Sequence, residues 1–255
     1  MTHPHNIPGL AAGDQHSLAA GPAGPGVPLT VWPVPPHAGC GPRPCAGPVA
    51  LTVAAKIITA FSWPGDLVAV LDGCPAATEA AAAAGRRVLA LIPAVPGERA
   101  GGGPPGRGAR AVRVRPGGPE QLLAPGDPDA GQAALAITGC CDPGCRAAPG
   151  PGAGEAALVF AAAQRVLWPG GVLAVRTASH PPGDDQPSDL AGHAVAAARA
   201  AGLIYAQHIV LVHAAISGDH LDPEPLPASQ RSQPGGSRIH SDLLVFTKHK
   251  EPAHG

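Results

Sequence analysis

Two short stretches of the sequence carry side chains that could do chemistry. The first, residues 72–75 with the sequence DGCP, combines a carboxylate that accepts hydrogen bonds with a glycine that lets a ligand approach the backbone. The second, residues 139–145 with the sequence GCCDPGC, supplies Asp142 as a hydrogen-bond acceptor for an amine. It also supplies Cys140 and Cys141, whose thiolates would be nucleophiles in an activating environment. The alternative for this second stretch is a purely structural turn.

The six cysteines indicate neither a disulfide scaffold nor a metal site. They are too sparse in a chain of 255 residues for a disulfide scaffold. No two of them have the two-residue spacing of a zinc knuckle, so we expect buried or free thiols and no bound metal. The alternative is a thiolate site that combines Cys140, Cys141 and Cys145 with Cys40 and Cys45. Five histidines also lack ligand spacing and are interpreted as surface or hydrogen-bonded residues: His180, His193, His208, His213 and His220.

The elements around the first stretch must position it at the edge of a sheet. Residues 67–71 are an apolar run of strand length, and turn residues follow them. Residues 76–84 are rich in alanine and predict a helix, with Pro75 at its first position and Gly85 as a left-handed cap. Residues 88–92 then resume as a strand. This strand, helix, strand order predicts a parallel sheet, in which ligands bind at the carboxyl ends of the strands.

The rest of the chain continues the alternation of strands and helices. The patterns predict helices over 50–61, 155–167 and 189–201, a helical turn over 119–123, and strands over 111–115, 133–138, 172–177, 203–212 and 242–247. The last two strands have no helix between them, so they can pair antiparallel at the edge of the sheet.

Composition limits the size of the core and the class of partner. The chain contains 35 glycines and 33 prolines, a composition close to that of disordered segments. We therefore expect a flexible arm over 1–48, a domain over 49–250 with loops at 93–110 and 217–238, and a tail over 251–255. The net charge of -1 excludes a globally basic nucleic-acid binder. No apolar run reaches the ~20 residues that span a bilayer, so we expect no membrane partner and a cytoplasmic location.

One region is locally basic despite the neutral total. Seven arginines cluster there with Glu98 as their acidic neighbour: Arg86, Arg87, Arg99, Arg107, Arg110, Arg113 and Arg115. Of these, Arg107, Arg110, Arg113 and Arg115 are the candidates for contacts to DNA phosphates. The alternative is a solvated loop in a chain that is biased toward arginine.

The order of elements, five alternating units closed by two helix-free strands, resembles the class I S-adenosylmethionine-dependent methyltransferase fold. The segment PGDLVAVLDGCPAATEAAAAAGRR is similar to the cofactor segment of bacterial DNA amino-methyltransferases, the N4-cytosine and N6-adenine group. AAAQRVLWPGGVLAVRT is similar to the passage into their fifth strand, and IHSDLLVFTKHK to their last strand. The resemblance covers residues 49–250. It implies an α/β, Rossmann-like fold with a seven-stranded, mainly parallel sheet and an antiparallel last strand.

The resemblance implies that S-adenosylmethionine binds at Asp72, Gly73, Pro75 and Thr78. The turn of the family needs several glycines, whereas residues 72–77 hold one glycine and a proline. The acidic residue that would receive the ribose hydroxyls falls at Ile92 or Pro93, whose side chains cannot accept hydrogen bonds. Glu98 could reach this place only from the loop that follows. We therefore expect the affinity for the cofactor to be weak or lost.

The resemblance also implies a base-methylating site at the second stretch. The family places an acidic or polar residue, two prolines and an aromatic there, and the aromatic stacks on a flipped base. Here Asp142 remains as acceptor for the amine, with Cys140 and Cys141 beside it, and the aromatic is absent. Three functions stay open: a methyltransferase for a nucleic-acid base, a catalytically silent relative that binds DNA or a protein partner, and a methyltransferase for a small molecule.

Overall fold

The structure is a computed structural model that describes residues 28–34, 48–92, 112–116, 126–139, 153–177, 190–217, 220–223 and 240–249. Its helices are α1 (Pro48–Phe61), α2 (Pro75–Ala83), α3 (Ala153–Val166) and α4 (Leu190–Ala200). Its strands are β1 (Leu29–Val34), β2 (Leu67–Val70), β3 (Arg87–Ile92), β4 (Val112–Pro116), β5 (Ala133–Thr138), β6 (Leu167–Thr177), β7 (Leu203–Ser217), β8 (His220–Pro223) and β9 (His240–Lys248). Among the described residues, no helix is both long enough and apolar enough to cross a membrane.

The strands form one sheet in the order β1-β7-β9-β6-β5-β2-β3-β4, and β8 pairs with β7 outside this path. β2 lies between β3 and β5 and is parallel to both, whereas β9 is antiparallel to β6 on one side and to β7 on the other. Seven consecutive strands, from β7 to β4, are therefore the predicted sheet with its antiparallel last strand. The Rossmann-like methyltransferase fold that the sequence indicates is confirmed.

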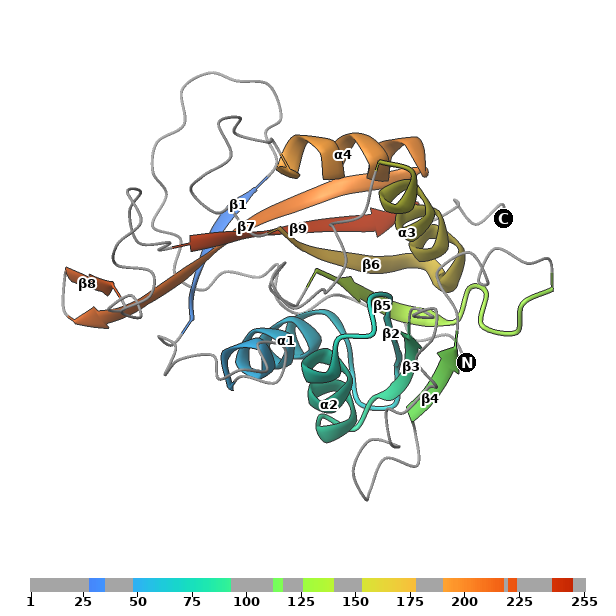
Figure 1. The fold of residues 1–255 in the computed structure, drawn as a ribbon, viewed down its shortest axis with the longest axis horizontal. Helices are drawn as coiled ribbons and strands as arrows, with labels where there is room; N and C mark the ends of the chain where they lie inside the picture. Colours follow the sequence, from blue (N-terminus) through green and yellow to red (C-terminus); the bar gives the residue numbers. More distant parts are fainter. Residues whose placement is uncertain are drawn as a thin grey trace, which may run out of the picture.

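Two layers of helices cover the sheet, α1 and α2 on one face and α3 and α4 on the other (Figure 1). Successive residues of β2 alternate between the two layers: Val68 and Val70 pack with α1 and α2, and Leu67 and Ala69 pack with the opposite layer. All four are buried, which explains why β2 is an uninterrupted apolar run. The carboxyl end of β2 is consequently fixed at the centre of the sheet.

Residues 29–34 form the strand β1, although the sequence predicts a flexible arm over residues 1–48. It is parallel to β7 and extends the sheet beyond the seven predicted strands. Trp32 stacks on Phe61 of α1 with ring centroids 6.1 Å apart, and Lys56 Nζ lies 5.0 Å from the centroid of the Trp32 ring. Gln207 Nε2 donates to Thr30 Oγ1 at 2.7 Å. This segment therefore joins the sheet because Trp32 packs on Phe61 and because the backbone of β1 pairs with the edge of β7.

Other elements also differ from the sequence expectations. β8 lies within the expected loop over 217–238. β6 begins at Leu167, five residues before the predicted start at residue 172, and β7 ends at Ser217, five residues after the predicted end at residue 212. The expected helical turn over 119–123, the whole loop over 93–110 and the tail over 251–255 lie outside the described residues, as do most of the loop over 217–238 and most of the arm over 1–48.

Candidate functional site at the carboxyl ends of the strands

The carboxyl ends of β2 and β5 meet through one side chain. Asp72 follows β2, and its Oδ2 accepts a hydrogen bond from the backbone N–H of Gly139, which follows β5, at 2.6 Å. Asp72 Oδ1 accepts a second bond from the N–H of Cys74 at 3.0 Å. The Leu71 N–H donates to the Ile137 carbonyl at 2.9 Å, which extends the pairing of the strands up to this point. The Asp72 carboxylate thus closes its own turn and attaches it to the start of the next loop.

Gly139 also lies against the end of β6. Its φ angle is 72°, and a Cβ atom at this position would be 2.1 Å from the Arg176 carbonyl oxygen. A side chain cannot occupy that space unless the backbone moves, so only glycine fits here. The ends of β2 and β5 are therefore joined by the bond between Gly139 and Asp72, and the backbone of Arg176 at the end of β6 packs closely against Gly139. The sequence gives no direct sign of this arrangement, except that Gly139 immediately follows an apolar strand.

The other three predicted cofactor residues have different environments. Gly73 has a φ angle of 65°, a conformation that L residues rarely adopt, and Pro75 is the first residue of α2. Thr78 is buried, and both its backbone N–H and its Oγ1 donate to the Cys74 carbonyl at 3.1 Å. Thr78 therefore stabilises the first turn of α2. Cys74 is a buried cysteine that packs in the α1 and α2 layer.

These residues fit S-adenosylmethionine only in part. The turn after β2 has the positive-φ glycine and the pinned acidic residue that let a ligand approach the backbone. The described end of β3 is Ile92, which offers no side-chain acceptor for ribose hydroxyls. Among the described residues, the turn after β2 could therefore contact the methionine end of the cofactor, whereas the end of β3 offers no contact for the ribose hydroxyls.

The predicted catalytic residues Cys140, Cys141 and Asp142 lie outside the described residues, directly after Gly139. Arg107 and Arg110 lie outside them as well. Arg113 and Arg115 occupy β4 at the edge of the sheet, where they pair with Leu89 and Leu91 of β3. Within the described ranges there is no group of three or more metal-ligating side chains.

Arg86 does not contribute to a basic surface. It is buried at the end of α2, and its Nη2 donates to the Ser62 carbonyl at 2.6 Å while its Nε donates to Ser62 Oγ at 3.2 Å. Its Nη1 donates to the Ala84 carbonyl. The guanidinium therefore joins the carboxyl ends of α1 and α2, where carbonyl groups give a negative potential. The basic cluster predicted from the sequence loses this member, and Arg87 remains exposed at the opposite end of β3 from Ile92.

A second polar pair lies on the α3 and α4 face of the sheet. His208 Nε2 is 2.9 Å from Asp242 Oδ1, and both side chains are partly buried. His208 is therefore a hydrogen-bonded histidine, which agrees with one of the two interpretations from the sequence. Burial, and to a smaller extent the negative charge of Asp242, raise the pKa of the Tyr205 phenol above its usual value. The ring of Tyr205 packs on Phe246 with centroids 5.3 Å apart.

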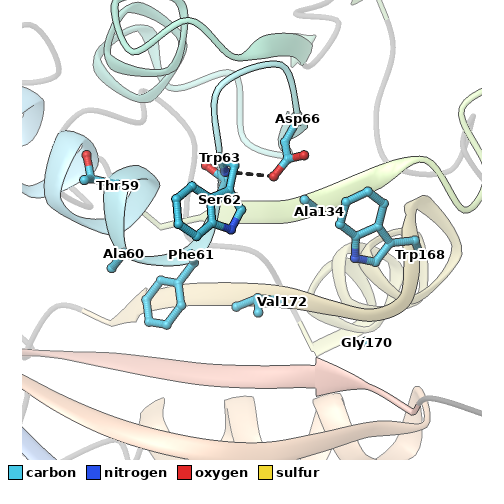
Figure 2. A pocket seen from close by; sticks show the side chains of 10 residues that line it. All are labelled: Thr59, Ala60, Phe61, Ser62, Trp63, Asp66, Ala134, Trp168, Gly170 and Val172. Carbon is cyan, nitrogen blue, oxygen red and sulfur yellow. Dashed lines mark hydrogen bonds between the residues drawn. The ribbon is translucent and has the colours of Figure 1, made fainter. Parts of the chain in front are cut away.

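A small pocket lies at the amino ends of β5 and β6, at the opposite ends of these strands from Gly139 and Arg176, and Ser62 is one of its lining residues (Figure 2). Its volume is about 70 Å³. The end of α1, the turn before β2 and the first residues of β6 line it, with Trp63 and Trp168 as its largest side chains. Sequence reasoning did not find it, because its residues come from three segments that meet only in the folded chain.

Comparisons with known proteins give matches among solved structures alone. No family model and no curated protein matches the chain. The geranyl diphosphate C-methyltransferase from Streptomyces coelicolor A3(2), solved with Mg²⁺, geranyl diphosphate and S-adenosyl-L-homocysteine, is 16% identical with a TM-score of 0.49, over 84% of this chain and 90% of that chain. The 1,6-didemethyltoxoflavin-N1-methyltransferase from Burkholderia thailandensis is 17% identical with a TM-score of 0.47, over 79% of each chain. A TehB-like SAM-dependent methyltransferase from Corynebacterium glutamicum is 13% identical with a TM-score of 0.44, over 76% of this chain and 86% of that chain. The fold assignment itself rests on the order and directions of the strands from β7 to β4.

Proposed function

We propose that this chain is an S-adenosylmethionine-dependent methyltransferase-like protein whose cofactor site is the turn after β2. The observation that carries the proposal is the hydrogen bond from Gly139 to Asp72, because it joins the two central strand ends at which open α/β sheets bind ligands. Asp72 would hold the turn in shape, and Gly73 would let the cofactor approach the backbone. When bound, the cofactor would supply a methyl group.

We expect this cofactor site to be weak. One buried hydrogen bond to a charged group is worth about 1.5–3 kcal/mol, so the missing ribose acceptor at Ile92 would lower the affinity about ten- to a hundredfold. Residues 72–77 also hold a single glycine, which restricts how closely the cofactor can approach.

The nature of the methyl acceptor is a further part of the proposal. The segments similar to DNA amino-methyltransferases favour descent from that group and an amine of a DNA base as acceptor. Asp142 would accept a hydrogen bond from that amine, and it lies three positions after Gly139, whose N–H donates to Asp72. Methyl transfer to DNA that disappears in Asp142→Ala and survives in Cys140→Ala and Cys141→Ala would support this role. Two alternatives remain: a catalytically silent cytoplasmic relative that binds DNA or a protein partner, and a methyltransferase for a small molecule.

Calorimetric titration with S-adenosylmethionine and with S-adenosylhomocysteine tests the proposal. We expect both to bind with dissociation constants weaker than micromolar. Asp72→Asn and Gly73→Val should abolish the heat signal, because the first removes the negative charge that receives two N–H groups and the second forces a β-branched residue to positive φ. Glu79→Gln, an exposed carboxylate on α2, is the matched control and should bind like the original chain. Absence of binding to the original chain would overturn the proposal.

A further inference from the structure

β1 is the end strand of the sheet, and its outer edge is a surface to which another strand can be added (Figure 1). Among the described strands, β1 pairs with β7 alone. The side chains of Leu29 and Val31 on this strand are 64% and 57% exposed. An exposed edge strand with apolar side chains is a template for pairing with another chain.

The hydrogen bonds to β7 determine which backbone groups of β1 face outward. The His208 N–H donates to the Pro28 carbonyl at 3.0 Å, and Leu29 is the register partner of His208. Along a strand, alternate residues direct both their N–H and their C=O groups to the same neighbouring strand. Thr30 therefore faces β7, whereas Leu29 and Val31 direct their N–H and C=O groups to the outer edge. These are two donors and two acceptors that no described strand uses.

The outer edge is closed at Pro33, the next residue that faces outward. Proline has no N–H to donate, and for this reason it occurs in sheets mainly on edge strands. The Pro33 carbonyl accepts a hydrogen bond from Lys56 Nζ of α1 at 3.3 Å. Lys56 Nζ also lies 5.0 Å from the centroid of the Trp32 ring, which keeps it near this carbonyl. An added strand therefore finds its full set of backbone partners at Leu29 and Val31 and not at Pro33.

We propose that the outer edge of β1 pairs with β1 of a second copy of this chain, antiparallel and about a two-fold axis at Thr30. In this register Leu29 of each copy lies opposite Val31 of the other. Each of the two pairs exchanges both N–H to C=O bonds, so every outward group of Leu29 and Val31 has a partner. An axis at Val31 would place Leu29 opposite Pro33, and the bonds of that pair would be lost. Within β1, the proline and Lys56 therefore select the axis at Thr30.

The composition of the strand favours a second copy over a different partner. Leu29 and Val31 lie on one face of the sheet, so their side chains would meet across the axis as apolar cross-strand pairs. β1 has no charged side chain, and edge strands that resist association commonly carry lysine or another charge. The net charge of the chain is only -1 at pH 7, so two copies approach with little repulsion. The same edge supplies both halves, which gives a closed, self-complementary interface.

The expected dimer is weak. Pairing over so few residues buries less than the ~1,200 Å² at which stable interfaces begin, so the two copies should associate reversibly. The proposal goes beyond the proposed function and does not depend on it, because four strands separate β1 from β2 and its cofactor turn: β7, β9, β6 and β5.

Sedimentation equilibrium of the full chain over a range of concentrations tests the proposal. We expect a reversible equilibrium of monomer and dimer with a dissociation constant of about 10 μM to 1 mM. Val31→Lys should weaken the dimer at least about tenfold, because it replaces two apolar cross-strand pairs and places like charges near the axis. The exposure of Val31 lets this variant fold. Ile204→Lys is the matched control, since Ile204 is 48% exposed on β7 outside the part that pairs with β1, and it should leave the association unchanged.

Cysteine substitutions test the register. Thr30 lies opposite its own copy in a non-hydrogen-bonded pair, with Cα atoms about 4.5 Å apart, which a disulfide can span. The two copies of Val31 are diagonal neighbours about 7–8 Å apart, beyond that reach. Thr30→Cys should therefore form an intermolecular disulfide faster than Val31→Cys, although Val31 is the more exposed. Mass spectrometry without reductant measures this, with the original chain as background for its own six cysteines.

Three results would overturn the proposal. The first is a chain that stays monomeric up to about 1 mM. The second is a dimer that Val31→Lys leaves unchanged, because its interface would lie elsewhere. The third is a disulfide that forms as fast in Val31→Cys as in Thr30→Cys, because the copies would then not pair about Thr30.

Discussion

The carboxylate of Asp72 receives the backbone N–H of Gly139 at 2.6 Å, although the two residues are 67 positions apart in the chain. A hydrogen bond to a charged acceptor is about twice as strong as one between neutral groups. Because Gly139 is the first residue of the stretch that holds Cys140, Cys141 and Asp142, the turn proposed to bind the cofactor also fixes where the proposed catalytic stretch begins. Any change of Asp72 should therefore affect both.

Gly139→Ala should be one of the most destabilising alanine substitutions of a glycine in this chain. The positive φ angle alone costs about 1–2 kcal/mol for an L residue, and the contact with the Arg176 carbonyl oxygen adds backbone displacement. We expect a loss of about 3 kcal/mol or more in the free energy of unfolding, measured by urea denaturation.

Gly202→Ala is the matched control for this experiment. Gly202 also has a positive φ angle, 80°, but nothing lies within 4 Å of its Cβ position. It should lose only the conformational cost of about 1–2 kcal/mol. Equal losses for the two variants would contradict a steric role for Arg176.

Trp32→Ala should detach β1 from the sheet. The Trp32 ring stacks on Phe61 and lies under Lys56 Nζ, so its removal takes away the main apolar anchor of this strand. We expect the free energy of unfolding to fall by about 2 kcal/mol, and the backbone amides of β1 to lose protection from hydrogen exchange. Val31→Ala, at an exposed position of the same strand, should change stability by less than about 0.5 kcal/mol.

β1 is a strand that local sequence patterns did not predict. The unit from β2 to β3 was predictable because strand, turn, helix and cap signals follow one another within residues 64–93, and each signal is local. The segment of β1 contains Pro33 and borders a proline-rich stretch, so its sequence does not indicate a strand. It forms a strand because it contacts Phe61 and pairs with β7, and both are distant in sequence. Patterns within the segment carry no record of those partners.

In the candidate site, too, local features were predictable from the sequence, and contacts between distant segments were not. Asp72 and Gly73 were predicted as site residues because residues after a buried strand lie at the edge where ligands bind, and this prediction still has to be tested by binding. Thr78 was identified by the resemblance, whereas its hydroxyl bonds to the Cys74 carbonyl inside α2. The bond between Asp72 and Gly139 depends on β2 and β5 being neighbours. The pocket of Trp63 and Trp168 depends on a bulge in β6, and a bulge follows from the pairing of two strands.

Tyr205 should titrate above its usual pKa. It is the single tyrosine of the chain, so the near-ultraviolet absorbance of phenolate reports it alone. Burial is the larger cause of the raised pKa, and the charge of Asp242 the smaller, so Asp242→Asn should lower the midpoint only in part.

The sign of the linked stability follows from the direction of this shift. The folded chain holds the phenol proton more tightly than the unfolded chain does, so this contribution is fully present below the unfolded pKa of about 10. It is lost as the pH rises through the folded pKa. A midpoint for the native chain that is equal to or below that of the chain in concentrated urea would contradict the assignment.

DNA binding, if the basic region supports it, should be electrostatic and indifferent to sequence. The predicted contacts are Arg107, Arg110, Arg113 and Arg115, and the chain lacks the aromatic residue that would hold a flipped base. Three or four phosphate contacts give a slope of about -3 for log K against log salt concentration. The measurement is fluorescence anisotropy of labelled duplexes of two unrelated sequences over a range of salt concentrations.

Replacement of these four arginines by alanine should flatten the slope toward zero, because each lost phosphate contact removes the release of about one counterion. Arg199→Ala removes an exposed arginine from α4, on a different layer of the molecule, and should leave the slope unchanged. Arg86 is omitted from the set because its guanidinium is buried against the carbonyls of Ser62 and Ala84, and its replacement would disturb the ends of α1 and α2.

Two results would contradict the prediction. The first is no change of anisotropy at low salt, which favours a silent protein that binds another protein. The second is tight binding to one of the two duplexes that salt does not weaken, since that requires recognition of base edges and not of phosphates.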